Sequence, residues 1–454
     1  MPHNILALIG NTPMVKAQHL DTGPCELFFK LESQNPGGSI KDRIALTMIE
    51  AAEQSGELKA GGMLVEATAG NTGLGLALVA SQKGYKLTLV IPDKMSQEKI
   101  FHLRAMGADV ILTRSDVGKG HPEYYQDMAQ RIARENGGFY VSQFTNPNNP
   151  LTHEQSTGPE ILQQMDGRID AVVVGVGSGG TLTGMGRYFS KHAPNVEMIL
   201  ADPKGSILAP LINDGIMIEP GSWLIEGIGE DFIPDVCDLD LVSHAYTISD
   251  SESIACAREL LKSEGIMCGS SSGTLLAAAL RYCRAQTTPK RVVSLVCDSG
   301  NKYLSKIYNE HWLDDHNLVL REQSNDLRDL ISRPHTKKGA VIIKPEDTLA
   351  AAYRKMKMYD VSQLPVMARG KLIGILNETD ILLAVQGNPS GFSITVSNAM
   401  VQELTTIQMH QPYTDLLPIF ESGMVAIVMD GDEFQGLITP IDLLQYLRKR
   451  TGQA

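Results

Sequence analysis

Lys41 stands at the start of a predicted helix, in the stretch NPGGSIKDR at residues 35–43. Pro36 and the two glycines after it predict a turn, and Ser39 predicts the cap of a helix over residues 40–54. The amine of Lys41 would then lie beside the free N–H groups and the positive end of the helix, which lowers its affinity for a proton. A lysine in that state reacts with carbonyl groups, although a solvated lysine in a capping turn fits this stretch equally well.

Three loops of small residues each lead into a predicted helix. GVGSGGT at residues 175–181 lets the backbone approach an anion and hold it at a helix N-terminus. Its glycines also fit a dinucleotide motif followed by Asp202, but its hydroxyl side chains and its position in mid-chain favour a terminal phosphate. TAGNTG at residues 68–73 suits a carboxylate, and CGSSSG at residues 268–273 lets a planar group approach. A plain helix cap explains either of these two loops as well.

A reactive lysine, a phosphate-binding loop and a carboxylate-binding loop together suggest pyridoxal phosphate. The lysine can form the Schiff base, the loop at residues 175–181 can take the phosphate, and the loop at residues 68–73 can take a substrate carboxylate. The sequence therefore predicts an enzyme that acts on amino acids.

The elements around these loops alternate between strands and helices from residue 26 to residue 296. A fully apolar strand is predicted at residues 171–174, and another apolar strand at residues 292–296. This alternation predicts an α/β fold of two subdomains with mostly parallel sheets covered on both faces. Site helices are expected at residues 74–82 and after residue 273, with another at about 153–165.

Residues 311–340 are polar and charged, and SRPHTKKG at residues 332–339 is a candidate linker. An internal repeat follows, in which Gly374 and Gly436 occupy matching positions. Each unit is expected to form a helix, two strands and a helix. Because one such unit cannot bury its own apolar face, the two units should pack as a pair.

Composition excludes several classes of partner. The net charge of −12 without blocks of like charge disfavours nucleic acid and anionic membranes, and no apolar run is long enough to span a membrane. The first residues lack the pattern of a signal peptide. The six cysteines are scattered and, like the histidines, lack zinc-ligand spacing. We therefore expect reduced thiols, no protein-held metal and a cytoplasmic protein.

The four motifs occur in the order and spacing of the cysteine synthase and cystathionine β-synthase family, which the chain resembles over residues 4–315. The resemblance implies a fold type II pyridoxal-phosphate enzyme, and the repeat resembles a Bateman module of two CBS domains. The animal haem-binding extension has no counterpart, so we expect no haem, as in a bacterial member of the family. The expected domains are a catalytic core at residues 1–315, a linker at 316–340, and CBS repeats at 341–390 and 397–450.

The resemblance also implies roles for single residues. Lys41 would form the Schiff base with the cofactor and move the Cα proton, while Asn71 would bond the ring hydroxyl and Ser271 the pyridine nitrogen. The cofactor phosphate would be held by Gly177, Ser178, Gly179, Gly180 and Thr181. The substrate would be held by Thr68, Asn71, Thr72, Gln143 and Gly227. A hydroxyl cannot protonate the ring as an aspartate would, which favours β-elimination over transamination.

Two branches of the family compete for the assignment. QFTNPNNP at residues 143–150 and HEQSTGPE at 153–160 are at home in cysteine synthases. DPKGS at residues 202–206, EGIGEDFIP at 226–234 and the CBS pair resemble the cystathionine β-synthase branch, although Glu230 stands where the animal enzymes have tyrosine. We therefore expect a transsulfuration lyase that condenses L-serine with L-homocysteine to L-cystathionine and water, with side reactions that release hydrogen sulfide. The alternative is a cysteine synthase that uses O-acetylserine and sulfide.

The repeat carries a regulatory hypothesis. In CBS domains the pattern G-h-h-[TS]-x-x-D places a hydroxyl and a carboxylate on a ribose, and GLITPID in the second repeat matches it at Thr439 and Asp442. The first repeat has Asn377 in place of the hydroxyl, before Asp380. These residues would bind an adenosyl ligand such as S-adenosylmethionine, or the module would serve as a ligand-free dimerisation element. The family implies a homodimer or a higher homo-oligomer.

Overall fold

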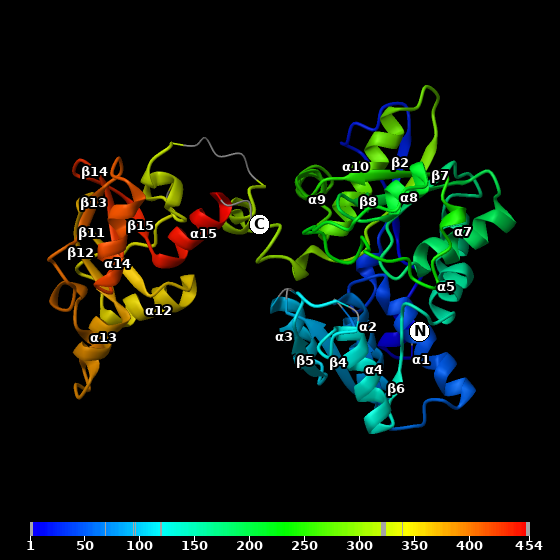
Figure 1. The fold of residues 1–454 in the computed structure, drawn as a ribbon, viewed down its shortest axis with the longest axis horizontal. Helices are drawn as coiled ribbons and strands as arrows, with labels where there is room; N and C mark the ends of the chain where they lie inside the picture. Colours follow the sequence, from blue (N-terminus) through cyan, green and yellow to red (C-terminus); the bar gives the residue numbers. More distant parts are fainter. Residues whose placement is uncertain are drawn as a thin grey trace. The chain divides into compact units, whose positions relative to one another are not determined.

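The computed structural model describes residues 3–68, 70–93, 95, 97–118, 120–318, 324–337 and 339–450. By its internal contacts the chain divides into two compact units, Met1–Asn309 and Glu310–Ala454 (Figure 1). Among the described residues, no helix is both long and apolar enough to cross a membrane.

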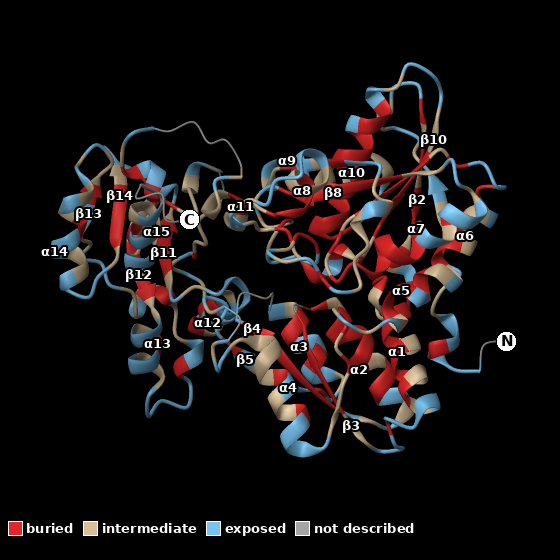
Figure 2. Cartoon of the chain, turned by 45° about the vertical axis from the view of Figure 1, so that its right-hand side comes forward, coloured by how far each residue is buried: buried red, intermediate tan, exposed pale blue. Residues whose placement is uncertain are grey.

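The first unit contains a six-stranded sheet in the order β1-β2-β10-β7-β8-β9. All neighbouring strands run parallel except β1, which pairs antiparallel with β2. The strands are β1 (Met14–Lys16), β2 (Glu26–Lys30), β7 (Ala171–Val174), β8 (Glu197–Pro203), β9 (His244–Ile248) and β10 (Arg291–Leu295). The longer helices of this part are α7 (Gly180–His192), α9 (Asp250–Glu264) and α10 (Ser270–Arg284). Figure 2 shows the central strands buried, with exposed residues on the outer faces of the helices.

A parallel four-stranded sheet in the order β5-β4-β3-β6 completes the first unit. Its strands are β3 (Met63–Ala67), β4 (Lys86–Pro92), β5 (Asp109–Thr113) and β6 (Phe139–Tyr140). Its helices are α1 (Lys41–Ser55), α2 (Asn71–Lys83), α3 (Gln97–Ala105) and α4 (Tyr125–Asn136). The apolar faces of α1 and α2 form one core with β3 and β4. The α/β class with mostly parallel sheets is thereby confirmed.

Three helices begin earlier than the sequence pattern predicts. Helix α2 starts at Asn71 and α10 at Ser270, because small polar residues that disfavour helix interiors are well tolerated in a first turn. The helix expected at residues 153–165 is composite. It comprises α5 (Asn148–Thr152), a π-helical turn (His153–Thr157) and α6 (Gly158–Gln164). Such π turns are frequent at functional sites.

The second unit contains the internal repeat. The first copy is α12 (Leu349–Tyr359), β11 (Gln363–Ala368), β12 (Lys371–Asn377) and α13 (Glu378–Val385). The second is β13 (Thr406–Gln408), α14 (Leu416–Glu421), β14 (Ala426–Asp430), β15 (Glu433–Ile438) and α15 (Pro440–Arg450). Val366 opposes Gly374 and Val428 opposes Gly436, with a bulge directly after each valine, so both hairpins share one register. One apolar cluster contains residues of both copies, which confirms that they pack as a pair.

Candidate active site

The turn before Lys41 is hydrogen-bonded to the residues that follow β10, here called the 297–299 segment. The N–H of Ile40 donates to the carbonyl of Cys297 at 2.9 Å, and the N–H of Ser299 donates to the carbonyl of Gly38 at 3.0 Å. Helix α2 packs closely against the first residue of α1, since a Cβ on Gly75 would lie 2.9 Å from the carbonyl oxygen of Lys41. The start of α1 is therefore held on two sides.

Lys41 is the first residue of α1, and its N–H donates to the hydroxyl of Ser39 at 3.2 Å. Ile40 rather than Ser39 occupies the N-cap position. Burial lowers the pKa of the Lys41 amine, while Cys297, Glu230 and Asp298 act in the opposite direction. Desolvation thus outweighs the nearby negative groups and raises the neutral fraction of an amine that attacks carbonyls.

Asn71, the first residue of α2, is held at both ends of its amide. Its Nδ2 donates to Oδ2 of Asp298 at 2.7 Å, and its Oδ1 accepts from Nζ of Lys302 at 2.9 Å. Asp298 is fully buried and also accepts from the hydroxyl of Tyr303 at 2.6 Å. Sequence reasoning missed Asp298 and Lys302. The sequence did place both residues after a central parallel strand, and this position could have indicated them, because ligands bind at the carboxyl ends of such strands.

Ser271 lies buried in the first turn of α10, and its side chain acts to lower the pKa of the Cys297 thiol. The neighbouring Ser272 hydroxyl accepts from the N–H of Cys297 at 2.9 Å. Burial raises the pKa of the Cys297 thiol to about 12, so it stays protonated at neutral pH. The 297–299 segment therefore brings Lys41, Asn71 and Ser271 to one place.

The glycine loop joins β7 to α7. Gly179 is the N-cap of α7 with φ +85°, and a Cβ on Gly180 would lie 1.9 Å from Oδ1 of Asn149. Asn149, which the sequence analysis did not single out, donates from Nδ2 to Ser178 Oγ at 2.9 Å and to the carbonyl of Gln143 at 2.8 Å. The loop is thus fixed from behind, and the first N–H groups of α7 lack intrahelical partners.

His153 supports the other end of this loop. Its Nε2 lies 3.3 Å from Oγ1 of Thr181 and its Nδ1 lies 2.9 Å from Oγ1 of Thr157. Burial, together with the positive charges of Lys41 and Arg43, holds the pKa of His153 well below its usual value. The ring is therefore neutral at physiological pH.

The residues expected at the substrate carboxylate lie around the start of α2. The Thr72 hydroxyl donates to Oε1 of Gln143 at 2.6 Å, and the Thr68 hydroxyl accepts from the N–H of Gly70 at 3.1 Å. Ala69 lies outside the described residues. The carbonyl oxygen of Gly227 lies 2.4 Å from the position of a Cβ on Gly177, which places Gly227 against the glycine loop. The structure thus brings these residues to the edge of the sheets where Lys41 lies.

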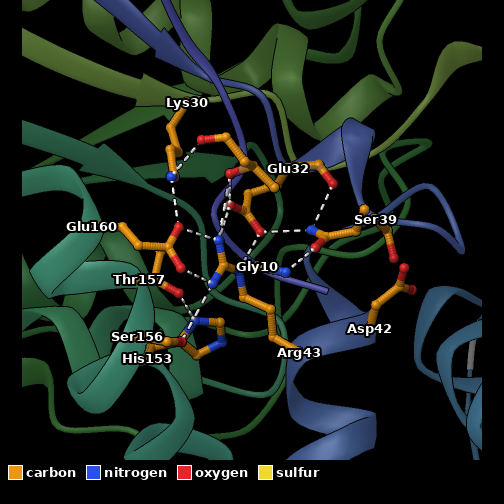
Figure 3. A network of polar contacts seen from close by, with 12 residues as sticks. Gly10, Lys30, Glu32, Ser39, Asp42, Arg43, His153, Ser156, Thr157 and Glu160 are labelled. Atoms are coloured by element: carbon orange, nitrogen blue, oxygen red, sulfur yellow. Dashed lines mark hydrogen bonds and ion pairs between the residues drawn. The ribbon is translucent and has the colours of Figure 1, made fainter. Parts of the chain in front are cut away.

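A buried ionic network, drawn in Figure 3, anchors α1 two residues beyond Lys41. The guanidinium of Arg43 donates to both carboxylate oxygens of Glu32 at 2.7 and 2.8 Å and to Oε1 of Glu160 at 2.7 Å. Lys30, also fully buried, donates to Oε2 of Glu160 at 2.7 Å. Burial alone would raise the pKa of Glu160, but Arg43 and Lys30 outweigh it and lower the pKa to about 2.

The proposed regulatory residues lie in the second unit and act there as helix caps. Oδ2 of Asp442 accepts from the N–H of Thr439 at 2.7 Å and from its hydroxyl at 2.5 Å, while Oδ1 accepts from the hydroxyl of Ser332. Asp380 forms a capping box with Asn377. The cavity that Asp442 and Ser332 line holds only about 40 Å³, whereas ligand pockets usually exceed roughly 300 Å³.

The part of the chain that the structure describes contains no group of three or more His, Cys, Asp or Glu side chains arranged to hold a metal ion. All six cysteines are free thiols.

Comparison with known families gives two matches. The family described as pyridoxal-phosphate dependent enzyme matches residues 5–298. The CBS domain matches twice, at residues 327–387 and 396–449.

Curated relatives named cystathionine beta-synthase match nearly the whole chain. A cystathionine beta-synthase of Dictyostelium discoideum is 38% identical over 98% of this chain and 92% of its own length. One of Apis mellifera is 35% identical over 98% and 91%. A cysteine synthase of Staphylococcus aureus is 42% identical but covers 66% of this chain and 95% of its own.

Solved structures resemble about two thirds of the chain. A hydrogen sulfide-producing enzyme from Fusobacterium nucleatum is 37% identical with a TM-score of 0.63 and covers 67% of this chain and 100% of its own. An O-ureido-L-serine synthase is 32% identical with a TM-score of 0.64, over 71% of this chain and 98% of its own.

The Arg43→Met substitution should destabilise the first unit by about 3–5 kcal/mol, because it leaves the fully buried carboxylate of Glu32 without its cationic partner. Urea unfolding measures this loss. Methionine at Arg114, whose ion pair with Asp116 is exposed, is the matched control and should leave the midpoint nearly unchanged. Equal effects of the two substitutions would contradict a buried ionic anchor.

Acid should weaken the same network. The pKa of Glu160 is depressed in the folded protein, so its contribution to stability is complete above about 4.5 and is lost as the pH falls towards 2. Between pH 4.5 and 3, the urea concentration at the midpoint of unfolding should therefore decrease less for the Glu160→Gln variant than for the wild type. A parallel decline of both proteins would contradict the assignment.

Proposed function

The chain belongs to the pyridoxal-phosphate-dependent enzyme family, and from this membership we propose that it condenses L-serine with L-homocysteine to L-cystathionine and water. The observation that carries the proposal is that Lys41, Asn71 and Ser271 meet at the 297–299 segment. Relatives named cystathionine beta-synthase align with almost the full chain, including its CBS domains, whereas the cysteine synthase covers two thirds of it. The similarity to cystathionine beta-synthases over almost the full chain favours the condensation of serine with homocysteine.

The residues present fit pyridoxal phosphate. The first turn of α7 offers N–H groups without intrahelical partners beside the hydroxyls of Ser178 and Thr181, which suits a phosphate dianion. A desolvated amine at Lys41 suits the carbonyl of the cofactor. We propose that Asn71 holds the ring hydroxyl and Ser271 the ring nitrogen, with Gly177, Gly179 and Gly180 beside the phosphate. The proposed cofactor set contains no haem.

Bound at this place, the cofactor supplies an electron sink for the pair of electrons left on the substrate Cα when its proton departs. Lys41 accepts that proton, and its lowered pKa allows the free amine to act as a base near neutral pH. The β-hydroxyl of serine then leaves as water with the proton that Lys41 took from Cα, and the sulfur of homocysteine bonds to Cβ. The proton released by the thiol passes through Lys41 to Cα.

The start of α2 holds the substrate carboxylate in this proposal. The Thr72 hydroxyl donates to Oε1 of Gln143. This contact fixes the orientation of the Gln143 amide, whose nitrogen is the end that can donate. Thr68 accepts from Gly70 and keeps its own hydroxyl proton to donate. The N–H groups at the N-terminus of α2 favour the same anion.

Glu230 supports homocysteine over sulfide as the second substrate. Its carboxylate acts electrostatically on Lys41, and its Oε1 lies 4.0 Å from the position of a Cβ on Gly177, so it faces the proposed site. A carboxylate there attracts the ammonium group of an amino acid thiol and offers nothing to sulfide. The cysteine synthase reaction with O-acetylserine remains the second candidate, on the strength of the 42% identity to the cysteine synthase.

The Lys41→Ala variant should lose the visible absorbance of protein-bound pyridoxal phosphate and all synthesis of cystathionine. The absorbance spectrum and an assay of purified protein measure both. Alanine at Lys16, an exposed lysine of the same unit, should change neither. A wild-type protein that binds no cofactor would overturn the proposed function.

The Glu230→Gln variant should raise the KM for homocysteine tenfold or more, because one charge-assisted contact is lost, with a smaller change in the KM for serine. Steady-state kinetics with each substrate varied in turn measure the two constants. Asparagine at the exposed neighbour Asp231 is the control. A wild-type preference for O-acetylserine and sulfide would decide for the second candidate.

We also propose that an adenosyl ligand binds the second CBS repeat, where its ribose replaces the Ser332 hydroxyl on Asp442 and the cavity of about 40 Å³ widens to admit it. Titration of the full chain with S-adenosylmethionine in a calorimeter should give heat that Asp442→Asn weakens at least tenfold. Asp380→Asn, which alters the equivalent cap in the first repeat, is the matched comparison. No heat with the wild type would leave the module as a scaffold alone.

A further inference from the structure

Lys302 lies buried at the end of a short 3₁₀ helix after the 297–299 segment, and only 7% of the residue is exposed. Its ammonium donates to the carbonyl oxygens of Gly37 and Gly38 at 3.1 Å each and to Oδ1 of Asn71 at 2.9 Å. A lysine ammonium has three protons, so it can donate to all three of these oxygens.

The three acceptors belong to two segments that must be placed relative to one another. Gly37 and Gly38 form the turn that delivers Lys41 to the start of α1. Asn71 is the first residue of α2. In the proposed function its side chain holds the ring hydroxyl of the cofactor. A single buried charge therefore connects the backbone that aims the lysine with the side chain that faces the ring.

Lys302 also determines which way the Asn71 amide is turned. Oδ1 of Asn71 faces the ammonium, while Nδ2 donates to the carboxylate of Asp298. The flipped amide would set its NH₂ group against a cation and its oxygen against an anion, and both contacts are repulsive. Because Nδ2 carries a second proton, an amide held in this way acts as a donor.

The charge on Lys302 depends on its neighbours. Burial lowers the pKa of the amine to about 8, Asp298 and Asp42 favour the charged form, and Lys99 opposes it. His102 is the further titratable group on which the charge of Lys302 acts. Near pH 7 the amine is therefore an ammonium ion that can make all three contacts.

We propose that Lys302 is a positioning residue, which ties the Gly37–Gly38 turn to Asn71 and holds the amide of Asn71 as a donor to the ring oxygen of the cofactor. The inference rests on the proposed function, because it takes the cofactor as the group that Asn71 faces. Without Lys302 the amide can rotate, so the deprotonated ring oxygen loses part of its hydrogen bonding and its pKa rises.

The test uses the purified full-length holoenzyme with Lys302→Met, which keeps the unbranched side chain as far as Cε and removes its charge and donors. We expect the pH midpoint of the visible cofactor band to move upward and kcat/KM for serine to fall at least tenfold. Lys302→Arg, which retains charge and donors, should recover most of both. Methionine at Lys290, which pairs with Glu197 and Tyr282, is the matched control and should leave both values unchanged.

A double substitution separates positioning from general weakening. If Lys302 acts through Asn71, then Lys302→Met should move the pH midpoint little further in a chain that already carries Asn71→Ala. Should the methionine variant fail to fold, Lys302→Gln carries the same comparison. If Lys302→Met has the same pH midpoint of the cofactor band and the same kcat/KM as the wild type, the inference is overturned while the proposed function stays intact. A wild type without bound cofactor would instead overturn the proposed function, and this inference with it.

Discussion

The buried carboxylate of Asp298 is the interaction on which the arrangement of the site depends. Asp298 has no exposed surface, so the cost of removing its charge from water must be offset by hydrogen bonds. The amide of Asn71 and the hydroxyl of Tyr303 supply them to Oδ2 at 2.7 and 2.6 Å, whereas Oδ1 accepts no hydrogen bond from the described residues. Oδ1 lies 2.0 Å from where a Cβ on Gly269 would be, which leaves room there for no side chain. One carboxylate thus constrains α2, the start of α10 and the segment after β10.

The topology explains why these parts meet at the end of β10. This strand lies between β2 and β7 and runs parallel to both, so the segments that follow the three strands emerge at one edge. Ser39 then pairs with Asp298 across an antiparallel bridge, and Cys268 pairs with Ser299 in the same way. The segment after β10 therefore acts as a short template on which the Lys41 turn and the start of α10 both assemble.

The sequence predicted the parts of the site whose chemistry is local. The sequence indicates Lys41, the glycine loop and Asn71, because a capping turn, a close backbone approach and a helix start each need particular residues within a few positions. The register shared by Gly374 and Gly436 was visible for the same reason. Asp298 and Lys302 were not, since they contact Asn71 across 227 and 231 positions and no local pattern encodes such a pairing.

The network around Arg43 shows what a buried ionic contact contributes that an apolar one would not. Well-packed apolar side chains often give equal or greater stability than a buried ion pair, so stability alone does not account for four charges at the start of α1. Their directionality does, because Arg43 reaches Glu32 and Glu160 through paired hydrogen bonds that tolerate little rotation of the helix (Figure 3). Two residues earlier, the turn before Lys41 is bonded to the 297–299 segment. The first turn of α1 is thus held both by directional ion pairs and by backbone hydrogen bonds, and the amine of Lys41 keeps one position through which a proton can pass in both directions.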